Sequence, residues 1–293
     1  MSTRPVVVVG DLATDVVAVL SGEAAPDSDR PATIRSRGGG AGANVAAHLA
    51  ALGVTVTLAG CVGDDPAGAV LLAELAGAGV GLAVRTVTGA ASGTIVSLVE
   101  PGGRRSMLAD RGANLDLRPG DVPAPLPGGH LHLSGYTLLD ERPRAAGLAA
   151  LAAAAAAGCT TSLDPASTGP LTAYGVPRWL ADTAGVGLLL PNADEARLLS
   201  GCADVTDAAR ALAARHEAVA VTLGAEGALW ASGTTLVHRP ARPARVVDTT
   251  GAGDAFTAGL LAVWLADPHG DPAAALDAGL ARATEVVGRP GAR

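Results

Sequence analysis

The residues best suited to chemistry stand near the C-terminal end, in the run Asp248-Thr249-Thr250-Gly251-Ala252-Gly253-Asp254-Ala255-Phe256, which leads into an apolar stretch that predicts a buried helix. Glycines in such a turn let the backbone approach a ligand closely. The first N–H groups of a helix lack partners within it and lie at the positive end of its dipole, so they can bind phosphate. We expect Asp254 to be ionised there and to accept a proton from a hydroxyl group that attacks a phosphoryl group.

An Asp that follows a glycine turn is also a common helix cap, and capping is the simpler interpretation of a short Gly-x-Gly-Asp. The complete run favours catalysis. It resembles the C-terminal signature of the ribokinase-like carbohydrate kinases, the phosphofructokinase-B family, and it lacks the Gly-Lys-Ser/Thr end of a P-loop. The resemblance implies an ATP-dependent phosphotransferase that acts on a hydroxyl group of a sugar or sugar-like substrate. It makes Asp254 the general base and makes Gly251, Ala252 and Gly253 the turn that stabilises the transferred phosphoryl group.

A second glycine cluster, Gly38-Gly39-Gly40-Ala41-Gly42-Ala43-Asn44, precedes a predicted helix over residues 45–52. Close packing of small residues would explain the glycines, but Asn44 offers both a donor and an acceptor to a polyhydroxylated ligand. The cluster resembles the sugar-binding motif of the same family. Asp15 follows the first predicted strand, and ligands bind beyond the carboxyl ends of strands in open α/β sheets. The resemblance implies that the acceptor is held by Asp15, Gly39, Gly40 and Asn44.

Two further motifs follow predicted strands. Asn192 and Glu195 are three residues apart, a spacing that fits a plain capping box equally well. In the family such a pair organises Mg²⁺ and its waters, and the resemblance carries that role to Asn192 and Glu195. Thr222, Gly224 and Gly227 resemble the family's nucleotide loop, although an ordinary β-turn would look similar. The resemblance therefore implies that these three residues contact ATP.

Residues 287–292 resemble the C-terminal motif of the family. The resemblance implies a monovalent-cation site, for K⁺, near Asp248 and Thr250. The sequence stops where family members usually continue for several residues, so we expect a site that uses this tail to be incomplete.

These motifs need a scaffold that brings strand ends together. Apolar runs such as residues 5–9 and 219–223 predict buried strands, and they alternate with helical stretches. The pattern predicts an α/β fold, with a mostly parallel central sheet flanked by helices in a single domain over residues 1–293. Consecutive strands without helices near residues 16–37 and 84–111 predict a small antiparallel lid, which the family builds from the same regions. Because a lid sheet leaves exposed edges, we expect a homodimer through the lid.

Composition narrows the class of protein. The 293 residues are 49% hydrophobic and 17% charged, as in a globular protein rather than a disordered chain. The net charge of −7 and the lack of a basic cluster argue against a nucleic-acid partner, and no apolar run is long enough to span a membrane. The three distant cysteines fit reduced thiols, and the N-terminal apolar run is too short for a signal peptide. We therefore expect a cytoplasmic protein.

The identity of the acceptor stays open. Ala13 and Ala41 stand where ribokinases have Asn and Lys, which argues against ribose as the settled substrate. Arg104, Arg105 and Arg111 could pair with the carboxylate of an acid sugar, or they could be solvated lid residues. The alternatives are a ketodeoxygluconate-type kinase, a nucleoside kinase, or a sugar-binding regulator that has lost catalysis. A dinucleotide oxidoreductase fits less well, because the first strand is not followed by the glycine pattern of that class.

Overall fold

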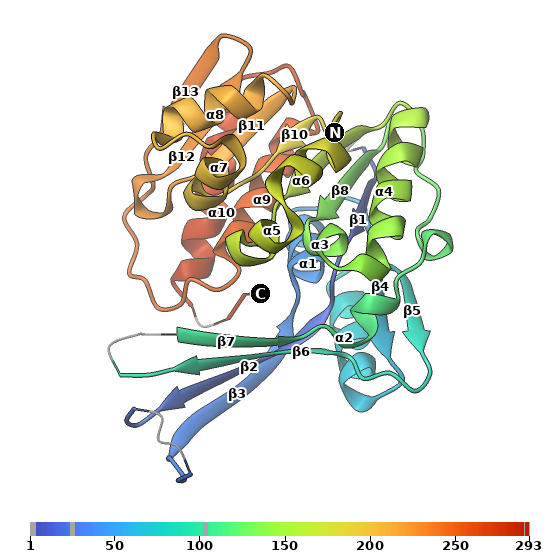
Figure 1. The fold of residues 1–293 in the computed structure, drawn as a ribbon, viewed down its shortest axis with the longest axis vertical. Coiled ribbons are helices and arrows are strands. Elements are labelled where there is room, and N and C mark those ends of the chain that lie inside the picture. Colours follow the sequence, from blue (N-terminus) through green and yellow to red (C-terminus); the bar gives the residue numbers. More distant parts are fainter. Residues whose placement is uncertain (1–3, 24–26, 102–104, 290, 293) are drawn as a thin grey trace.

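The computed structural model describes residues 4–23, 27–101, 105–289 and 291–292. Within them the chain forms a nine-stranded sheet between two layers of helices, and a separate four-stranded sheet projects from this body (Figure 1). We call the smaller sheet the lid. The α/β class and the mostly parallel central sheet predicted from the sequence are both confirmed.

The large sheet supplies the edge at which the predicted motifs meet. From β5 to β11 all neighbouring strands are parallel, so their carboxyl ends lie along one edge, whereas β12 and β13 form an antiparallel hairpin that the sequence did not predict. In spatial order the strands are β13 (Thr235–Arg239), β12 (Ala228–Ser232), β11 (Ala218–Thr222), β10 (Leu188–Leu189), β9 (Thr160–Asp164), β8 (His130–Ser134), β1 (Val6–Val9), β4 (Val56–Gly63) and β5 (Gly81–Val87).

Helices cover both faces of this sheet, and each face has its own apolar core. Val8 of β1 packs in one core with Leu49 and Phe256, while the adjacent Val9 packs in the other with Trp179, because successive side chains of a strand point to opposite faces. The first core contains residues of α1 (Ala41–Ala51), α2 (Pro66–Gly77), α9 (Ala252–Trp264) and α10 (Pro272–Val287). The second contains residues of α3 (Tyr136–Leu139), α4 (Glu141–Ala156), α5 (Thr168–Tyr174), α6 (Val176–Asp182), α7 (Ala193–Ser200) and α8 (Val205–Ala213).

Short 3-10 helices complete the connections: η1 (Gly112–Asp116), η2 (Pro119–Asp121) and η3 (Gly224–Glu226). In the part of the chain that the structure describes, no helix combines the length and the apolar character that crossing a membrane would require.

The lid differs in two respects from the sequence prediction. Its strands are β3 (Ala32–Gly39), β2 (Ala13–Leu20), β6 (Gly93–Val99) and β7 (Arg105–Asp110), in that order. β2 pairs with β6 in parallel, so the lid is mixed rather than antiparallel. Residues 84–87, expected in the lid, belong instead to β5 and pair with β4 in the large sheet. Local sequence shows that a segment is extended, but it does not show which sheet the segment joins.

A buried amide helps to tie the lid to the body. Asn114 donates hydrogen bonds to the carbonyl oxygens of Leu12 (2.8 Å) and Arg111 (2.9 Å) and accepts one from the Leu12 N–H (2.9 Å). Leu12 directly precedes β2, and Arg111 directly follows β7. The two strands that leave and re-enter the body are therefore held at one point.

Candidate active site

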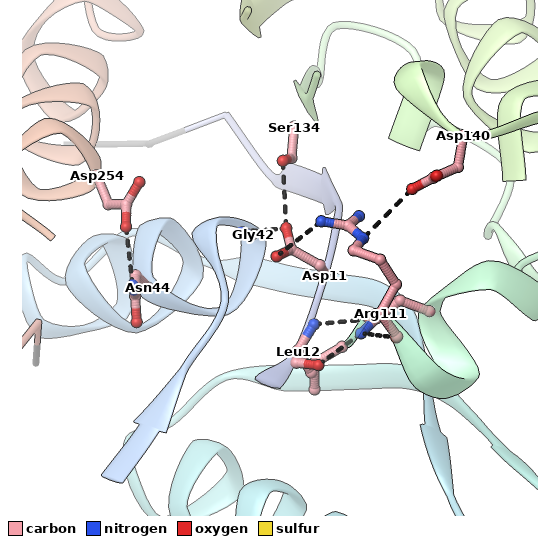
Figure 2. A network of polar contacts seen from close by, with 9 residues as sticks. Asp11, Leu12, Gly42, Asn44, Arg111, Ser134, Asp140 and Asp254 are labelled. Carbon is pink, nitrogen blue, oxygen red and sulfur yellow. Dashed lines mark hydrogen bonds and ion pairs between the residues drawn. The ribbon is translucent and has the colours of Figure 1, made fainter. Parts of the chain in front are cut away.

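Asp254 and Asn44 join the two glycine-rich turns. Asp254 lies in the first turn of α9, and Asn44 lies in the first turn of α1. The Asn44 amide donates a hydrogen bond to the Asp254 carboxylate at 2.8 Å (Figure 2). Two motifs separated by 210 positions in the sequence therefore meet through their functional side chains.

Helix capping does not account for Asp254. Within the described residues its carboxylate is hydrogen-bonded to Asn44, not to a backbone N–H of the first turn of α9. The helix begins after Gly251, whose φ of 74° is left-handed and whose added Cβ would lie 2.4 Å from the Cβ of Ala292. Glycine is thus required at position 251 to end the turn and admit residue 292.

The surroundings of Asp254 favour its protonated form. Burial raises its pKa well above the usual value, and the charges of Asp164, Asp11 and Asp15 raise it further, whereas the hydrogen bond from Asn44 lowers it. The sequence prediction that the helix dipole keeps this carboxyl group ionised is wrong, because burial and repulsion between carboxylates outweigh the dipole. A carboxylate with a raised pKa is the better proton acceptor near neutral pH.

Asn44 also presents an unsatisfied acceptor. The side chain is 4% exposed, and its Oδ1 has no hydrogen-bond partner within the described residues. A buried oxygen left without a donor costs about 1–3 kcal/mol. A hydroxyl group of a ligand next to Asp254 would remove that cost, so the site fits an alcohol.

Gly39 and Gly40 allow α1 to approach the strand ends. A Cβ at Gly39 would lie 2.2 Å from Oδ2 of Asp15, and Gly40 has a φ of 93° and lies directly before α1. Packing therefore explains both glycines. Asp15 itself lines a cavity of about 410 Å³ between the lid and residues 247–250, together with Asp248 and Thr250.

Asp11 also lies at this edge of the sheet, although the sequence prediction gave it no role in the site. It is 4% exposed at the carboxyl end of β1. Its Oδ1 accepts from the Ser134 hydroxyl (3.3 Å) and the Gly42 N–H (3.4 Å), and its Oδ2 lies 3.8 Å from Arg111 (Figure 2). In the sequence, the signal for a role of Asp11 is its position directly after an apolar strand that ends in glycine.

Arg111 is engaged by the protein's own carboxylates. Its Nε lies 3.4 Å from Asp140, and its guanidinium stacks over Tyr136 at 4.6 Å from the ring centroid. Together with the Asp11 contact, these interactions engage Arg111 within the protein, so its guanidinium is not free to meet an acid sugar. Arg104 lies outside the described residues, as does the side chain of Arg105.

A second cavity, of about 600 Å³, lies on the other side of the turn before α9. Thr222, Gly224 and Gly227 line it with Ala252 and Gly253, so the predicted nucleotide loop faces the predicted phosphate turn. Gly227 has a φ of 106°, and a Cβ there would lie 2.0 Å from the Arg239 carbonyl oxygen. The backbone itself therefore requires that glycine.

Gly253 is different, because neither packing nor backbone conformation among the described residues requires a glycine there. A Cβ at position 253 would meet no atom within 4 Å, and its φ is not left-handed. Within the described residues, the N–H groups of Gly253 and Asp254 have no backbone acceptor, whereas the Ala252 N–H donates to the Thr249 carbonyl at 3.2 Å. The open space and the two free donors make this helix end fit a phosphate group.

Asn192 and Glu195 do form a capping box. The Asn192 N–H donates to Glu195 at 2.9 Å, and the Glu195 N–H donates to the Asn192 side chain at 2.9 Å. Asn192 also forms a parallel β-bridge with Thr222, which places the start of α7 beside the nucleotide loop. The box holds Glu195, 3% exposed, at the edge of the site.

A neighbouring carboxyl group, that of Asp164, interacts electrostatically with Glu195. Burial and then the charge of Asp164 raise the pKa of Glu195 to about 7, and burial together with the charge of Asp11 raises the pKa of Asp164 to about 6. Asp164 ends β9 directly before Pro165, a position that could have been noticed in the sequence. A divalent cation would favour the ionised forms of both groups, so the pair fits Mg²⁺. Within the described residues no three His, Cys, Asp or Glu side chains form a metal cluster, and Mg²⁺ usually retains several waters.

Asp248 holds the loop that enters the phosphate turn. Its Oδ1 accepts from the N–H (3.0 Å) and hydroxyl (2.7 Å) of Thr250, and its Oδ2 accepts from the Gly291 N–H (3.1 Å). Asp248 and Thr250 are therefore brought together, and they are tied to the C-terminal segment.

Comparisons with known proteins found similar sequences and a similar solved structure. A model described as pfkB family carbohydrate kinase matches residues 3–293. A fructokinase of Klebsiella pneumoniae is 36% identical over 255 residues, which cover 84% of this chain and 82% of that protein. An ATP-dependent ribose-1-phosphate kinase of Halopiger xanaduensis is 35% identical over 280 residues, which cover 92% and 87%. The crystal structure of aminoimidazole riboside kinase from Salmonella enterica, complexed with aminoimidazole riboside and an ATP analogue, has a TM-score of 0.82 and 28% identity, covering 99% of this chain and 95% of that one.

Proposed function

The chain belongs to the pfkB family of carbohydrate kinases, which are ATP-dependent phosphotransferases, and we propose that it transfers the γ-phosphoryl group of ATP to a hydroxyl group of a sugar or riboside, with Asp254 as the general base. The observation that carries the proposal is the 2.8 Å contact between Asp254 and Asn44, whose remaining oxygen lacks a donor. A substrate hydroxyl group at this point would contact both side chains.

The roles of the chain's own residues follow from this placement. The acceptor hydroxyl group donates to the Asn44 oxygen or the Asp254 carboxylate and loses its proton to Asp254 as its oxygen attacks the γ-phosphorus. The free N–H groups of Gly253 and Asp254 stabilise the charge on the transferred group. Asp15 and Asp11 orient the other hydroxyl groups. In-line phosphoryl transfer depends mainly on such positioning and charge stabilisation.

ATP is proposed to occupy the 600 Å³ cavity, against Thr222, Gly224 and Gly227. Mg²⁺ would be held through waters by Glu195 and Asp164, with Asn192 fixing the position of Glu195. When bound, the ion neutralises phosphate charge during transfer. K⁺ is proposed to bind the loop that contains Asp248 and Thr250, which borders the phosphate turn.

The outer face of the lid is proposed to pair with a second copy of the chain. Alternation along the strands puts Val16, Ile34, Leu98 and Leu108 on the face opposite Asp15. Ile34 is 64% and Leu108 60% exposed in the isolated chain. A contiguous apolar face of this kind is suited to a partner surface, and a dimer across the lid would cover it.

An ADP-release assay across free sugars, ribosides and sugar phosphates, each with ATP and Mg²⁺, tests the proposed function. We expect acceptor-dependent ADP release with at least one of them and its loss in Asp254→Asn. Binding of an acceptor without any ADP release would instead identify a sugar-binding regulator.

A further inference from the structure

A third cavity, of about 460 Å³, lies at the edge of the large sheet opposite the active site. It is bordered by Glu217, which directly precedes β11, and by Ser232 and Thr235, which flank the turn between β12 and β13. The C-terminal end of α9 and the N-terminal end of α10 complete it. Because α9 has 13 residues, its length of about 20 Å separates this cavity from the turn that carries Asp254. The proposed phosphoryl transfer therefore does not use it.

Two tryptophans and Val263 supply an apolar surface in this cavity. Trp230 and Trp264 are nearly buried, whereas Val263 is 38% exposed. The Trp230 indole N–H donates to the Ser232 hydroxyl group at 3.0 Å. The Trp264 ring packs edge-on against His130, with the ring centroids 5.7 Å apart. Both indole rings are thus held in place by the protein, and a cavity of this size with aromatic walls is typical of small-molecule sites.

The indole N–H of Trp264 is a donor that the protein leaves unused. It has no acceptor within the described residues, although the side chain is only 6% exposed. The protein does not enclose this N–H, in contrast to the indole N–H of Trp179, so it borders open space, and this cavity is the open space that Trp264 lines. A ligand without an acceptor would displace water and leave the donor unpaired, which lowers affinity. The N–H therefore favours a ligand that carries an acceptor.

The charge around the cavity favours a cation. Carboxylates of Glu217, Asp267 and Asp271 line it, and within the described part of the chain no Lys or Arg does. Asp271 caps α10 by accepting from the Ala273 N–H at 2.9 Å, and Asp267 accepts from the His269 N–H at 3.3 Å, so both help to hold the connection between the two helices. The exposed Glu217 carboxylate has no partner among the described residues. The negative end of the α9 dipole adds to this potential.

We propose that this cavity is a further ligand site, separate from those for ATP and the acceptor, and that its ligand is an organic ammonium ion with an apolar body and a hydrogen-bond acceptor. The ammonium group pairs with Glu217, and the acceptor receives the Trp264 N–H. The apolar body packs on Val263 and the two indole rings. A bare metal ion would leave these apolar walls unused, and within the described residues no three His, Cys, Asp or Glu side chains form a cluster that could hold one. An anion would be repelled by the carboxylates.

Titration calorimetry with matched probes tests the proposal. Phenylethanolamine carries an ammonium group, a hydroxyl group and an apolar ring. Phenethylamine lacks the hydroxyl group, 1-phenylethanol lacks the ammonium group, and mandelate has a carboxylate in place of the aminomethyl group. The variants are Glu217→Gln and, as a control, Glu141→Gln, which removes the same charge from the exposed start of α4. Each titration is repeated with saturating ATP and Mg²⁺, which shows whether the probe occupies the nucleotide cavity.

We expect phenylethanolamine to bind with a Kd of about 1 mM or below, as a ligand of this size can, and 1-phenylethanol and mandelate to bind at least about tenfold more weakly. Phenethylamine should fall between. Glu217→Gln should weaken phenylethanolamine about tenfold, the size of a lost charge-assisted contact, whereas Glu141→Gln and ATP should leave its Kd unchanged. No binding, equal affinity for the charged and neutral probes, no effect of Glu217→Gln, or displacement by ATP would each overturn the proposal. None of these results depends on turnover, so the proposed kinase function is tested separately.

Discussion

Replacing Asp254 with Asn should separate catalysis from stability. Asn has nearly the same shape, and its side-chain oxygen can still accept the hydrogen bond from Asn44, which is 2.8 Å long in the structure. It cannot take up the acceptor's proton at neutral pH. Loss of a general base typically costs about 10²–10⁴ in rate, which corresponds to about 2.7–5.4 kcal/mol of activation free energy. We therefore expect kcat to fall by this order, while the affinities for ATP and acceptor stay within a few-fold.

The same replacement should stabilise the fold at neutral pH. The pKa of Asp254 is raised in the folded state, so the folded chain holds this proton more tightly than the unfolded chain. Stability from this group is therefore full below the ordinary Asp pKa and is lost as pH rises toward the raised value. Asn carries no charge to bury, so the Tm of Asp254→Asn should exceed that of the unaltered protein at pH 7–8, and the difference should shrink toward pH 4.

Two measurements test these predictions for Asp254→Asn. Initial rates with saturating ATP, acceptor and Mg²⁺ give kcat, and calorimetric or fluorescence melting between pH 4 and pH 8 gives Tm. Near-normal turnover in Asp254→Asn would refute the role of Asp254 as the base. A Tm at pH 7–8 equal to or below that of the unaltered protein would refute the account of its raised pKa.

Three other predictions concern different parts of the molecule. Gly253→Ala should keep or raise the Tm, because helix propensity favours Ala by up to about 1 kcal/mol. The same variant should lower kcat/KM about 10–100-fold, because the added methyl group enters the phosphate site. Gly251→Ala, by contrast, should lower the Tm, because residue 251 has a left-handed φ of 74°. If Gly253→Ala has normal kcat/KM, phosphate does not bind at this helix end. The apparent affinity for Mg²⁺ should weaken about tenfold from pH 8 to pH 6, because Glu195, with a pKa of about 7, takes up a proton. Metal titrations of Glu195→Gln should show a flatter dependence of Mg²⁺ affinity on pH. An equal pH dependence in both proteins would exclude Glu195 from the metal site. Light scattering at micromolar concentration should give a dimer mass, and Ile34→Glu should give a monomer mass; a monomer before substitution would count against the lid interface.

Several features could be read from the sequence because they depend on local physics. Glycines before Asp254 and Asn44 mark turns that begin helices, and valine-rich runs between helical stretches mark a parallel sheet. The capping box of Asn192 and Glu195 follows from a spacing of three residues alone. Each of these signals lies within a few positions of the residue it concerns.

Other features depend on which distant segments come together, and only the tertiary structure decided them. Residues 84–87 join the large sheet, and the lid is mixed, because strand pairing depends on topology rather than on the strand's own residues. The raised pKa values of Asp254 and Glu195 arise from burial next to Asp164, which lies far from both in the sequence. Position 253 keeps an open space and free N–H groups, whereas Gly227 and Gly251 are fixed by backbone conformation. Sequence identifies these residues as glycine or carboxylate, but their electrostatics and free space are set by neighbours that the fold supplies.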